Sequence, residues 1–177
     1  MDWYGLLVAA VAAERVGELV VARRNERWSR ARGAIEAGRG HYPAMVALHT
    51  ALLLGCLTEV WLTGRPFVPA LAWPMLAVLG GAQALRWWCI ATLGSRWNTR
   101  VIVVPGLPLV ARGPYRVLRH PNYVAVVAEG AALPLVHTAW VTALLFTLAD
   151  AVVLTVRIRC ENRALDGVAP ALGSVPA

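Results

Sequence analysis

The densest group of polar side chains occupies residues 112–123, which read Arg-Gly-Pro-Tyr-Arg-Val-Leu-Arg-His-Pro-Asn-Tyr. A helix facing hydrocarbon could not tolerate so many polar groups, so this segment is predicted to lie at or just above a bilayer surface. Its arginine and histidine side chains can donate hydrogen bonds to a carboxylate, and its tyrosine rings can cover a cation or a flat ring. The segment is therefore a candidate site for a small molecule that carries charged groups.

A carboxylate that belongs to this site is expected farther along the chain, at Glu161. It can accept hydrogen bonds from hydroxyl or ammonium groups, and an ion pair with Arg157, four residues earlier, is a structural alternative that can coexist with binding. Gly113 permits close backbone approach, while Pro114 and Pro121 stiffen the loop. No Gly-x-Gly-x-x-Gly follows a strand pattern, so a nucleotide-type ligand is not expected to bind in the Rossmann manner.

The ordered groups Gly113-Pro114-Tyr115, Arg119-His120-Pro121 with Tyr123, and Glu161 resemble the isoprenylcysteine carboxyl methyltransferase family over roughly Leu85 to Leu165. The resemblance implies an integral-membrane methyltransferase with S-adenosylmethionine as cofactor and a lipophilic substrate. It also implies a cofactor-binding set: Gly113, Pro114, Tyr115, Arg119, His120, Pro121, Tyr123 and Glu161. Asn162 departs from the family pattern, because many relatives have a second glutamate there.

Glu129 is a candidate catalytic residue in the apolar run that follows. The motif, with Glu129 and Leu133-Pro134 after it, resembles a bacterial subgroup that methylates alkylpyrones or alkylresorcinols made by type III polyketide synthases. A resorcinol phenol needs a general base, for which Glu129 is the candidate, whereas a pyrone enol or a carboxylate is already an anion at neutral pH. The alternative for Glu129 is an ion pair with an arginine such as Arg86. Arg157 is assigned to the catalytic set with Glu129.

Other functions stay open at this point. The acceptor could be a prenylated cysteine instead of a polyketide lipid. A sterol-type membrane reductase with a nicotinamide cofactor would use similar basic loops but is normally much longer. A non-catalytic membrane scaffold would explain the hydropathy and the charge, but not the ordered motif.

Composition places the whole chain in a membrane. Of its 177 residues, 58% are hydrophobic, whereas about half is usual in soluble domains. The mean hydropathy is +0.57. All 17 basic residues are arginines and the net charge is +7, which fits cytoplasmic loops and anionic lipid headgroups rather than nucleic acid. The three cysteines are scattered, so neither a disulfide nor a metal site is predicted.

The apolar segments predict an all-α integral membrane fold with about five membrane segments, the last two forming a helical hairpin whose arms are short for independent spans. The predicted segments are Trp3–Val21, Pro43–Thr63, Ala70–Ile90, Asn122–His137 and Trp140–Val156. Arginines concentrate in 22–42, 91–121 and 157–163, so the positive-inside rule predicts an external N-terminus, a cytoplasmic C-terminus and a cytoplasmic cofactor-binding loop region, in a bacterial inner membrane.

Finer features complete the sequence-based description. Val101–Val104 is β-branched and precedes a Pro-Gly turn, so it is expected to be extended. Trp97-Asn98-Thr99 is expected to pack over the site, with anchoring at the membrane interface as the alternative. We expect one membrane methyltransferase domain over 1–165, with its cofactor-binding core at 85–165, and a flexible tail over 166–177. The oligomeric state is left open.

Overall fold

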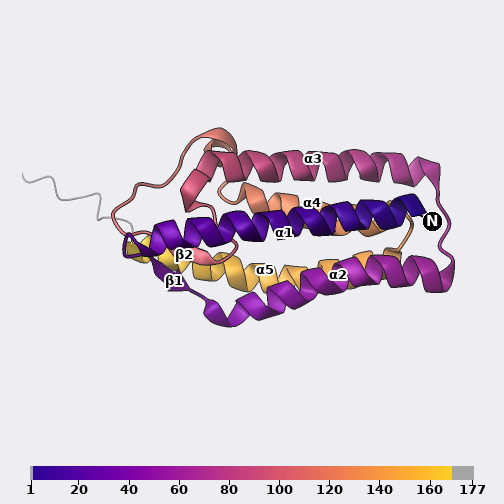
Figure 1. Ribbon diagram of the computed structural model, residues 1–177, viewed down its shortest axis with the longest axis horizontal. Helices are drawn as coiled ribbons and strands as arrows, with labels where there is room; N and C mark the ends of the chain where they lie inside the picture. The colour runs from indigo at the N-terminus through magenta and orange to yellow at the C-terminus, as the bar shows by residue number, and fades with distance from the viewer. Residues whose placement is uncertain (1, 169–177) are drawn as a thin grey trace, which may run out of the picture.

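The computed structural model describes residues 2–168 as a bundle of five α-helices that lie side by side and alternate in direction (Figure 1). The helices are α1 (Asp2–Arg30), α2 (Tyr42–Thr63), α3 (Pro69–Leu93), α4 (Pro121–Leu135) and α5 (Trp140–Val168). The predicted all-α architecture and the hairpin of the last two helices are confirmed. The first helix starts at the opposite end of the bundle from the end of α5 (Figure 1).

Three helices within residues 2–168 are long and apolar enough to cross a membrane, in segments Arg39–Thr63, Pro69–Arg96 and Trp140–Gly167. They correspond to α2, α3 and α5. The predicted first segment lies in α1, but Glu14, Arg15 and Glu18 make the middle of this helix too polar for it to count among the three candidate membrane spans. Glu18 is buried against the other helices. α1 therefore contributes charges to the interior of the bundle, and α4 is a short helix of 15 residues.

Two segment boundaries differ from the sequence-based expectation. The segment 22–30, expected to belong to a basic loop, continues α1 to Arg30. Arginine and glutamate favour helices, and Arg30 Nε donates to Glu26 one turn earlier over 2.9 Å. At the other end of the chain α5 continues to Val168, so residues 166–168 are helical and not part of a tail. The remaining residues of the predicted tail, 169–177, lie outside the described part.

A two-stranded antiparallel ribbon closes one end of the bundle. Strand β2 (Val101–Val103) is the extended piece that the sequence predicts. It pairs with β1 (Ile35–Ala37), a strand that the sequence analysis does not predict. Glu36 is 5% exposed and accepts hydrogen bonds from Arg100 over 2.8 Å and from Arg39 over 3.1 Å. Arg30, the last residue of α1, also pairs with Glu36 over 3.1 Å, so these contacts hold the ribbon to the end of α1 and to the turn before α2.

The opposite half of the bundle holds the main apolar core, which fixes the α4–α5 hairpin. Tyr4 is fully buried and donates a hydrogen bond to the carbonyl of Leu133 over 3.1 Å. Gly130 faces the ring of Phe146 so closely that a Cβ atom would clash, which lets α4 and α5 approach each other. Glu59 of α2 accepts hydrogen bonds from backbone amides in the first turn of α5. This rigid half sets the positions of the helix ends that build the site.

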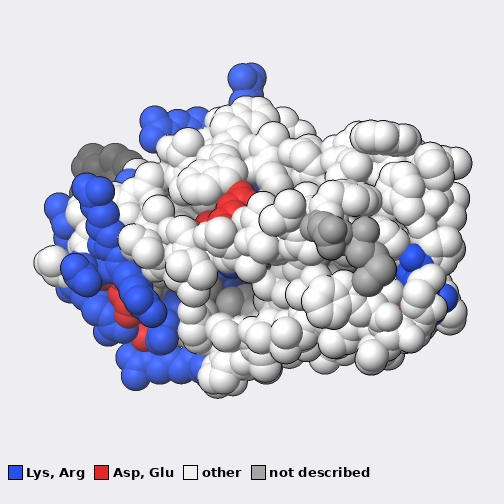
Figure 2. Space-filling view, turned by 45° about the vertical axis from the view of Figure 1, so that its right-hand side comes forward, with Lys and Arg blue, Asp and Glu red and all other residues white. Residues whose placement is uncertain are grey.

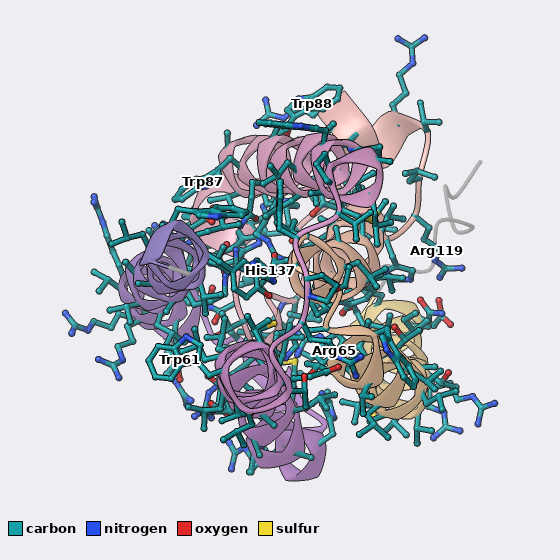
Figure 3. All side chains as sticks on the ribbon, turned by 90° about the vertical axis from the view of Figure 1, so that its right-hand side faces the viewer. Trp61, Arg65, Trp87, Trp88, Arg119 and His137 are labelled. Atoms are coloured by element: carbon teal, nitrogen blue, oxygen red, sulfur yellow. The ribbon has the colours of Figure 1, made fainter. Side chains whose placement is uncertain are left out.

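Charge and aromatic residues mark the two ends and the flanks. Most of the visible arginines gather at the ribbon end, a few lie at the upper edge and the opposite end, and the face between is mostly white with a small acidic patch (Figure 2). The exposed side chains of Trp61, Trp87 and Trp88 point outward from the helices (Figure 3). The buried side chain of His137 lies between the helices. An apolar flank with exposed tryptophans is typical of a protein surrounded by lipid.

Candidate functional site

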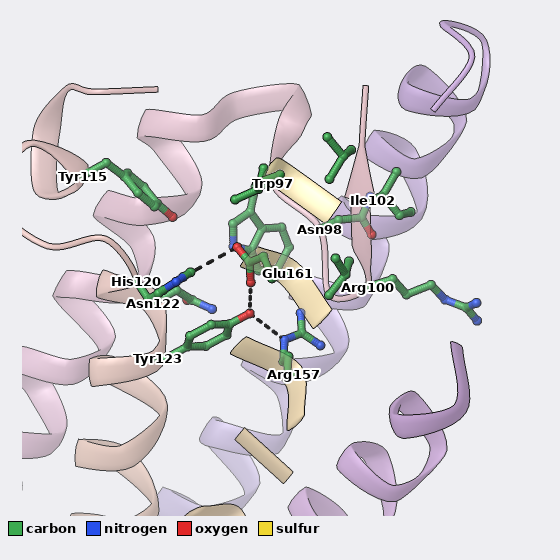
Figure 4. Close-up of a pocket in the computed structure, with 13 residues that line it drawn as sticks. Trp97, Asn98, Arg100, Ile102, Tyr115, His120, Asn122, Tyr123, Arg157 and Glu161 are labelled. Carbon is green, nitrogen blue, oxygen red and sulfur yellow. Dashed lines mark hydrogen bonds and ion pairs between the residues drawn. The ribbon is translucent and has the colours of Figure 1, made fainter. Parts of the chain in front are cut away.

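A polar hollow of about 550 Å³ opens at the ribbon end of the bundle. One side comes from the 3-10 turn η3 (Gly113–Arg116) and the start of α4, the other from residues 97–103, and α5 contributes the rest (Figure 4). Its lining consists of Trp97, Asn98, Arg100, Val101, Ile102, Val103, Tyr115, His120, Asn122, Tyr123, Arg157, Glu161 and Leu165. The structure thus gathers Tyr115, His120, Tyr123, Arg157 and Glu161 from the predicted set.

A connected set of polar contacts joins α4 to α5 at this hollow. The hydroxyl of Tyr123 donates a hydrogen bond to the carboxylate of Glu161 and accepts one from Arg157 Nε over 2.9 Å (Figure 4). Arg157 and Glu161 are one helical turn apart on α5, so both face the same side. They share the Tyr123 hydroxyl, which lies between them. This contact keeps a carboxylate and a guanidinium fixed at one wall of the hollow.

His120 is held by a stacked ring and by polar contacts at both of its ring nitrogens. It stacks on Tyr123 with ring centroids 5.3 Å apart, its Nε2 lies 3.1 Å from the Asn162 side-chain oxygen, and its Nδ1 lies 3.7 Å from Glu161. Asn162, the position that departs from the family pattern, therefore orients the histidine. Because a hydrogen bond from Nε2 to Asn162 needs the proton on Nε2, Nδ1 is then free to accept or, when protonated, to pair with Glu161.

The local sequence explains how these side chains reach the hollow. Pro121 occupies the first turn of α4, where its missing amide proton costs nothing, and is buried there. His120 immediately before it has a non-helical backbone, and Tyr123 follows in the first turn. Tyr115 comes from η3, and burial raises the pKa of its hydroxyl, so it remains protonated and can act as a donor.

Four predicted cofactor residues do not line the hollow: Gly113, Pro114, Arg119 and Pro121. Gly113 has a φ of +55°, and a Cβ atom there would lie 2.6 Å from the Thr92 hydroxyl, so it allows close approach to α3 and not to a ligand. Arg119 is 64% exposed and pairs with Asp166 at 3.7 Å. The expectation that Arg119 helps to bind a ligand carboxylate therefore has no support from its position. These residues shape the loop that carries Tyr115 and His120.

A second, larger hollow of about 960 Å³ extends from the first into the bundle. Much of its lining is apolar, from residues such as Leu53, Val126 and Leu154 on three different helices. The two hollows share a wall that consists of Trp97, Asn98, Asn122, Tyr123 and Arg157. We call these the polar hollow and the apolar hollow. Their contact gives a polar molecule and an apolar molecule a common meeting point.

Glu129 does not lie where a general base for the acceptor is expected, at the lining of a hollow. It is 3% exposed, forms an ion pair with Arg86, which is 4% exposed, and lies 3.5 Å from Arg15. Arg15 in turn pairs with Glu18 over 2.9 Å. Glu129 lines neither hollow, whereas Arg86 lines the apolar one. The structure thus shows the ion-pair alternative, because Glu129 points from α4 toward α3 and α1.

The site also contains residues that the motif does not single out. Asn25 of α1 donates hydrogen bonds to the carbonyls of Gly94 and Trp97, over 3.0 and 2.8 Å, and so fixes the segment that follows α3. This places Trp97 and Asn98 over both hollows, as expected for that segment. Asn122 lies inside the motif, but nothing in the sequence indicates which way its amide points.

The fold and the site define a class: a helical membrane-type bundle in which a polar hollow adjoins a more apolar one. A family model described as "Isoprenylcysteine carboxyl methyltransferase (ICMT) family" matches residues 75–167, which include every predicted site residue. The chain belongs to the isoprenylcysteine carboxyl methyltransferase family. It is accordingly an integral membrane protein of a methyltransferase family.

Two relatives match nearly the whole chain. The uncharacterized protein YpbQ of Bacillus subtilis is 42% identical over 166 residues, which cover 93% of this chain and 96% of that protein. An uncharacterized protein of Haemophilus influenzae is 26% identical over 171 residues, which cover 96% of this chain and 99% of that protein. Both relatives extend over α1 and α2 as well as the part that the family model matches.

Proposed function

We propose that the protein transfers a methyl group from S-adenosylmethionine to an oxygen of a lipophilic acceptor, most favourably a polyketide-derived alkylpyrone or alkylresorcinol. One observation carries the proposal: the polar hollow and the apolar hollow share the wall formed by Trp97, Asn98, Asn122, Tyr123 and Arg157. A charged cofactor and a molecule with an apolar tail would meet there.

The residues of the polar hollow fit the cofactor's chemistry. Bound S-adenosylmethionine supplies a methyl group on a positively charged sulfur, beside an ammonium, a carboxylate, a ribose and an adenine. Glu161 can accept from the ammonium or the ribose hydroxyls, and His120 can donate to the carboxylate. Tyr115 and Tyr123 offer aromatic faces to the adenine or the sulfonium. These side chains match the charged groups of S-adenosylmethionine, so the proposal invokes no other charged ligand.

Arg157 is the residue best placed to act on the acceptor. It is 6% exposed, lines both hollows and is held by Tyr123, so its positive charge is fixed at the shared wall. A fixed cation in a water-poor site stabilises a negatively charged oxygen more than water would. The remaining contribution of the protein is to bring the two molecules together and to exclude water.

The choice of acceptor rests on the resemblance to the alkylpyrone and alkylresorcinol subgroup, with a prenylated cysteine as the alternative. Glu129 remains the candidate base for a phenolic acceptor. Its contacts favour a second role, in which it holds Arg86 at the edge of the apolar hollow. A prediction below separates these roles.

The proposed orientation follows the positive-inside rule. Arg27, Arg96 and Arg112 are at the ribbon end of the bundle, and this end would face the cytoplasm, where S-adenosylmethionine is available. The N-terminus would lie outside, and the acceptor's tail would enter from the bilayer. We place the protein in the inner membrane of a bacterial cell.

A transfer assay tests the proposal. Purified protein in lipid nanodiscs would be given S-adenosylmethionine with a labelled methyl group and a long-chain alkylresorcinol or alkylpyrone. The proposal predicts label in the lipid extract, and a prenylated cysteine analogue should accept much less. Label in the prenylated cysteine alone would move the function to the alternative acceptor, and label in neither extract would contradict acceptance of these lipids.

A further inference from the structure

Two asparagine side chains face the junction of the hollows from different segments. Asn98 follows the 3-10 turn η2 (Gly94–Arg96) after α3, and Asn122 lies in the first turn of α4. Both line the polar and the apolar hollow. Figure 4 shows them on opposite sides of the polar hollow, with Arg157 and Glu161 between them in the view. A molecule at the junction would therefore meet an amide on each side.

These amides have unsatisfied hydrogen-bonding groups. The side-chain nitrogen and oxygen of Asn98 and the side-chain oxygen of Asn122 are buried without a hydrogen-bond partner among residues 2–168. Buried polar groups are almost always paired, so three unpaired atoms at one junction point to a partner that the protein does not supply. The Asn98 amide thus has one donor group and one acceptor to be satisfied.

The backbone keeps both asparagines in place. Asn25 holds the carbonyls on either side of the Gly94–Trp97 segment, and Pro121 fixes the start of α4 immediately before Asn122. Trp97 is buried beside Asn98. The backbone positions of both residues are thus fixed, so a ligand would have to order only the two side-chain amides.

We infer that Asn98 and Asn122 bind the polar head of the acceptor and select a head that both donates and accepts hydrogen bonds. The inference rests on the proposed function. The two residues border the apolar hollow, where the head of a molecule with an apolar tail would end, whereas His120 and Glu161 border only the polar one. A hydroxyl beside a second oxygen, as in a phenol or an enol, satisfies a donor and an acceptor. A carboxylate only accepts, so it would leave an amide oxygen unpaired against a negative charge.

The test measures binding and does not depend on turnover. Protein saturated with S-adenosylhomocysteine would be titrated with a long-chain alkylresorcinol and with a fatty acid of the same chain length, for the parent and for Asn98→Leu and Asn122→Leu. Each leucine keeps the approximate size of the side chain and removes its hydrogen bonds. We expect the dissociation constant of the alkylresorcinol to rise about tenfold or more, that of the fatty acid to change little or fall, and that of S-adenosylhomocysteine to stay near the parental value.

Two further variants sharpen the result. Asn98→Asp keeps the shape and the acceptor oxygen but replaces the donor, so it should retain more alkylresorcinol affinity than Asn98→Leu and should weaken fatty-acid binding through charge repulsion. The control is Thr155→Val on α5, whose hydroxyl donates to the Ala151 carbonyl over 2.7 Å and lines neither hollow. It should bind both lipids like the parent.

The possible failures are distinct. If the parent does not bind S-adenosylhomocysteine, the proposed function fails. If the parent binds it but the leucine variants keep the parental preference between the two lipids, the inference is wrong. It is equally wrong if both variants lose S-adenosylhomocysteine affinity by the same factor as lipid affinity, because the amides would then bind the cofactor.

Discussion

Arg157 Nε donates a hydrogen bond to the hydroxyl of Tyr123 over 2.9 Å, and this contact joins α5 to α4 at the wall that both hollows share. The same hydroxyl donates to Glu161. One phenol thereby fixes a cation beside the acceptor's proposed position and an anion beside the cofactor's.

Tyr123→Phe removes the hydroxyl and keeps the ring that stacks on His120. We expect the affinity for S-adenosylhomocysteine to fall about tenfold to a hundredfold, since hydrogen bonds to charged groups contribute roughly 1.5 to 3 kcal/mol. Isothermal calorimetry on detergent-purified protein measures the change. Tyr4→Phe is the matched control, because Tyr4 also donates a buried hydrogen bond but lies in the core at the other end. It should lower thermal stability without changing ligand affinity, and equal losses in the two variants would contradict the assignment.

Glu129→Gln separates a base from an ion-pair partner. Glu129 pairs with buried Arg86, and in the variant Arg86 would keep only the more distant Glu18, at 3.6 Å, as a carboxylate partner. Removing one partner of a buried ion pair costs up to about 3 to 5 kcal/mol. We therefore expect a lower melting temperature, near-normal S-adenosylhomocysteine affinity and an unchanged ratio of rates on phenolic and carboxylate acceptors.

A different pattern would restore the base. If Glu129→Gln slows methylation of a phenol by about a hundredfold, while an already anionic acceptor and the melting temperature are unaffected, Glu129 acts as the general base. Unchanged stability together with unchanged rates would contradict both roles. The three outcomes can be read from one preparation of the variant.

Part of this arrangement is predictable from the sequence. His120 and Tyr123 lie at the start of α4, which Pro121 marks, and Tyr115 lies in the η3 turn shortly before it. Glu161 lies on the same face of α5 as Arg157, so the convergence of these residues follows from order and spacing. The direction of Glu129 does not, because helical periodicity gives the face of a residue but not the helix opposite that face. The exposed position of Arg119 could not be predicted for a similar reason. Membership in a motif does not determine which side of a loop faces the ligand.

The ribbon shows a second limit. The extended character of Val101–Val103 is visible in its β-branched residues, but its pairing with Ile35–Ala37 depends on how α1 and α3 place two distant segments. Asn98 enters the site through that same placement and through Asn25. Contacts that the tertiary fold creates between distant segments have no local sequence signal.

Acid should weaken the ribbon through Glu36. Burial alone would raise the pKa of this carboxyl, but hydrogen bonds and charge from Arg100, with Arg39 and Arg30 nearby, lower the pKa below its ordinary value. The ionised carboxylate therefore stabilises the fold above the unfolded-state pKa of about 4.3, and this stabilisation is lost as the pH falls through the lower folded-state value.

Melting temperatures of the parent and of Glu36→Gln, measured from about pH 7 to about pH 3, check this effect. The difference between the two proteins should be largest at neutral pH and should vanish in acid. Glu26→Gln is the control, because Glu26 is more exposed and pairs only with Arg30 in the described structure. A difference between parent and Glu36→Gln that persists or grows in acid would contradict the assigned role of the carboxylate.

The orientation can be tested by labelling single cysteines in sealed inside-out and right-side-out vesicles. Cys56 and Cys89 are buried, so the background variant needs only Cys160→Ser. Cysteines that replace Arg27 and Arg112, at the ribbon end, should react with an impermeant reagent from the cytoplasmic side. A cysteine that replaces Val68, between α2 and α3, should react from the other side. Labelling of position 27 only from outside would reverse the orientation.

The central claim is that the polar hollow binds S-adenosylmethionine through His120 and Glu161. Its most direct test is calorimetric titration of the detergent-purified protein with S-adenosylhomocysteine and, separately, with NADPH. We predict that only S-adenosylhomocysteine binds the parent. His120→Ala and Glu161→Ala should weaken that binding about tenfold to a hundredfold while remaining folded, and Arg119→Ala, at the exposed position, should leave it unchanged. Binding of NADPH in place of S-adenosylhomocysteine, or parental affinity in both His120→Ala and Glu161→Ala, would contradict the account.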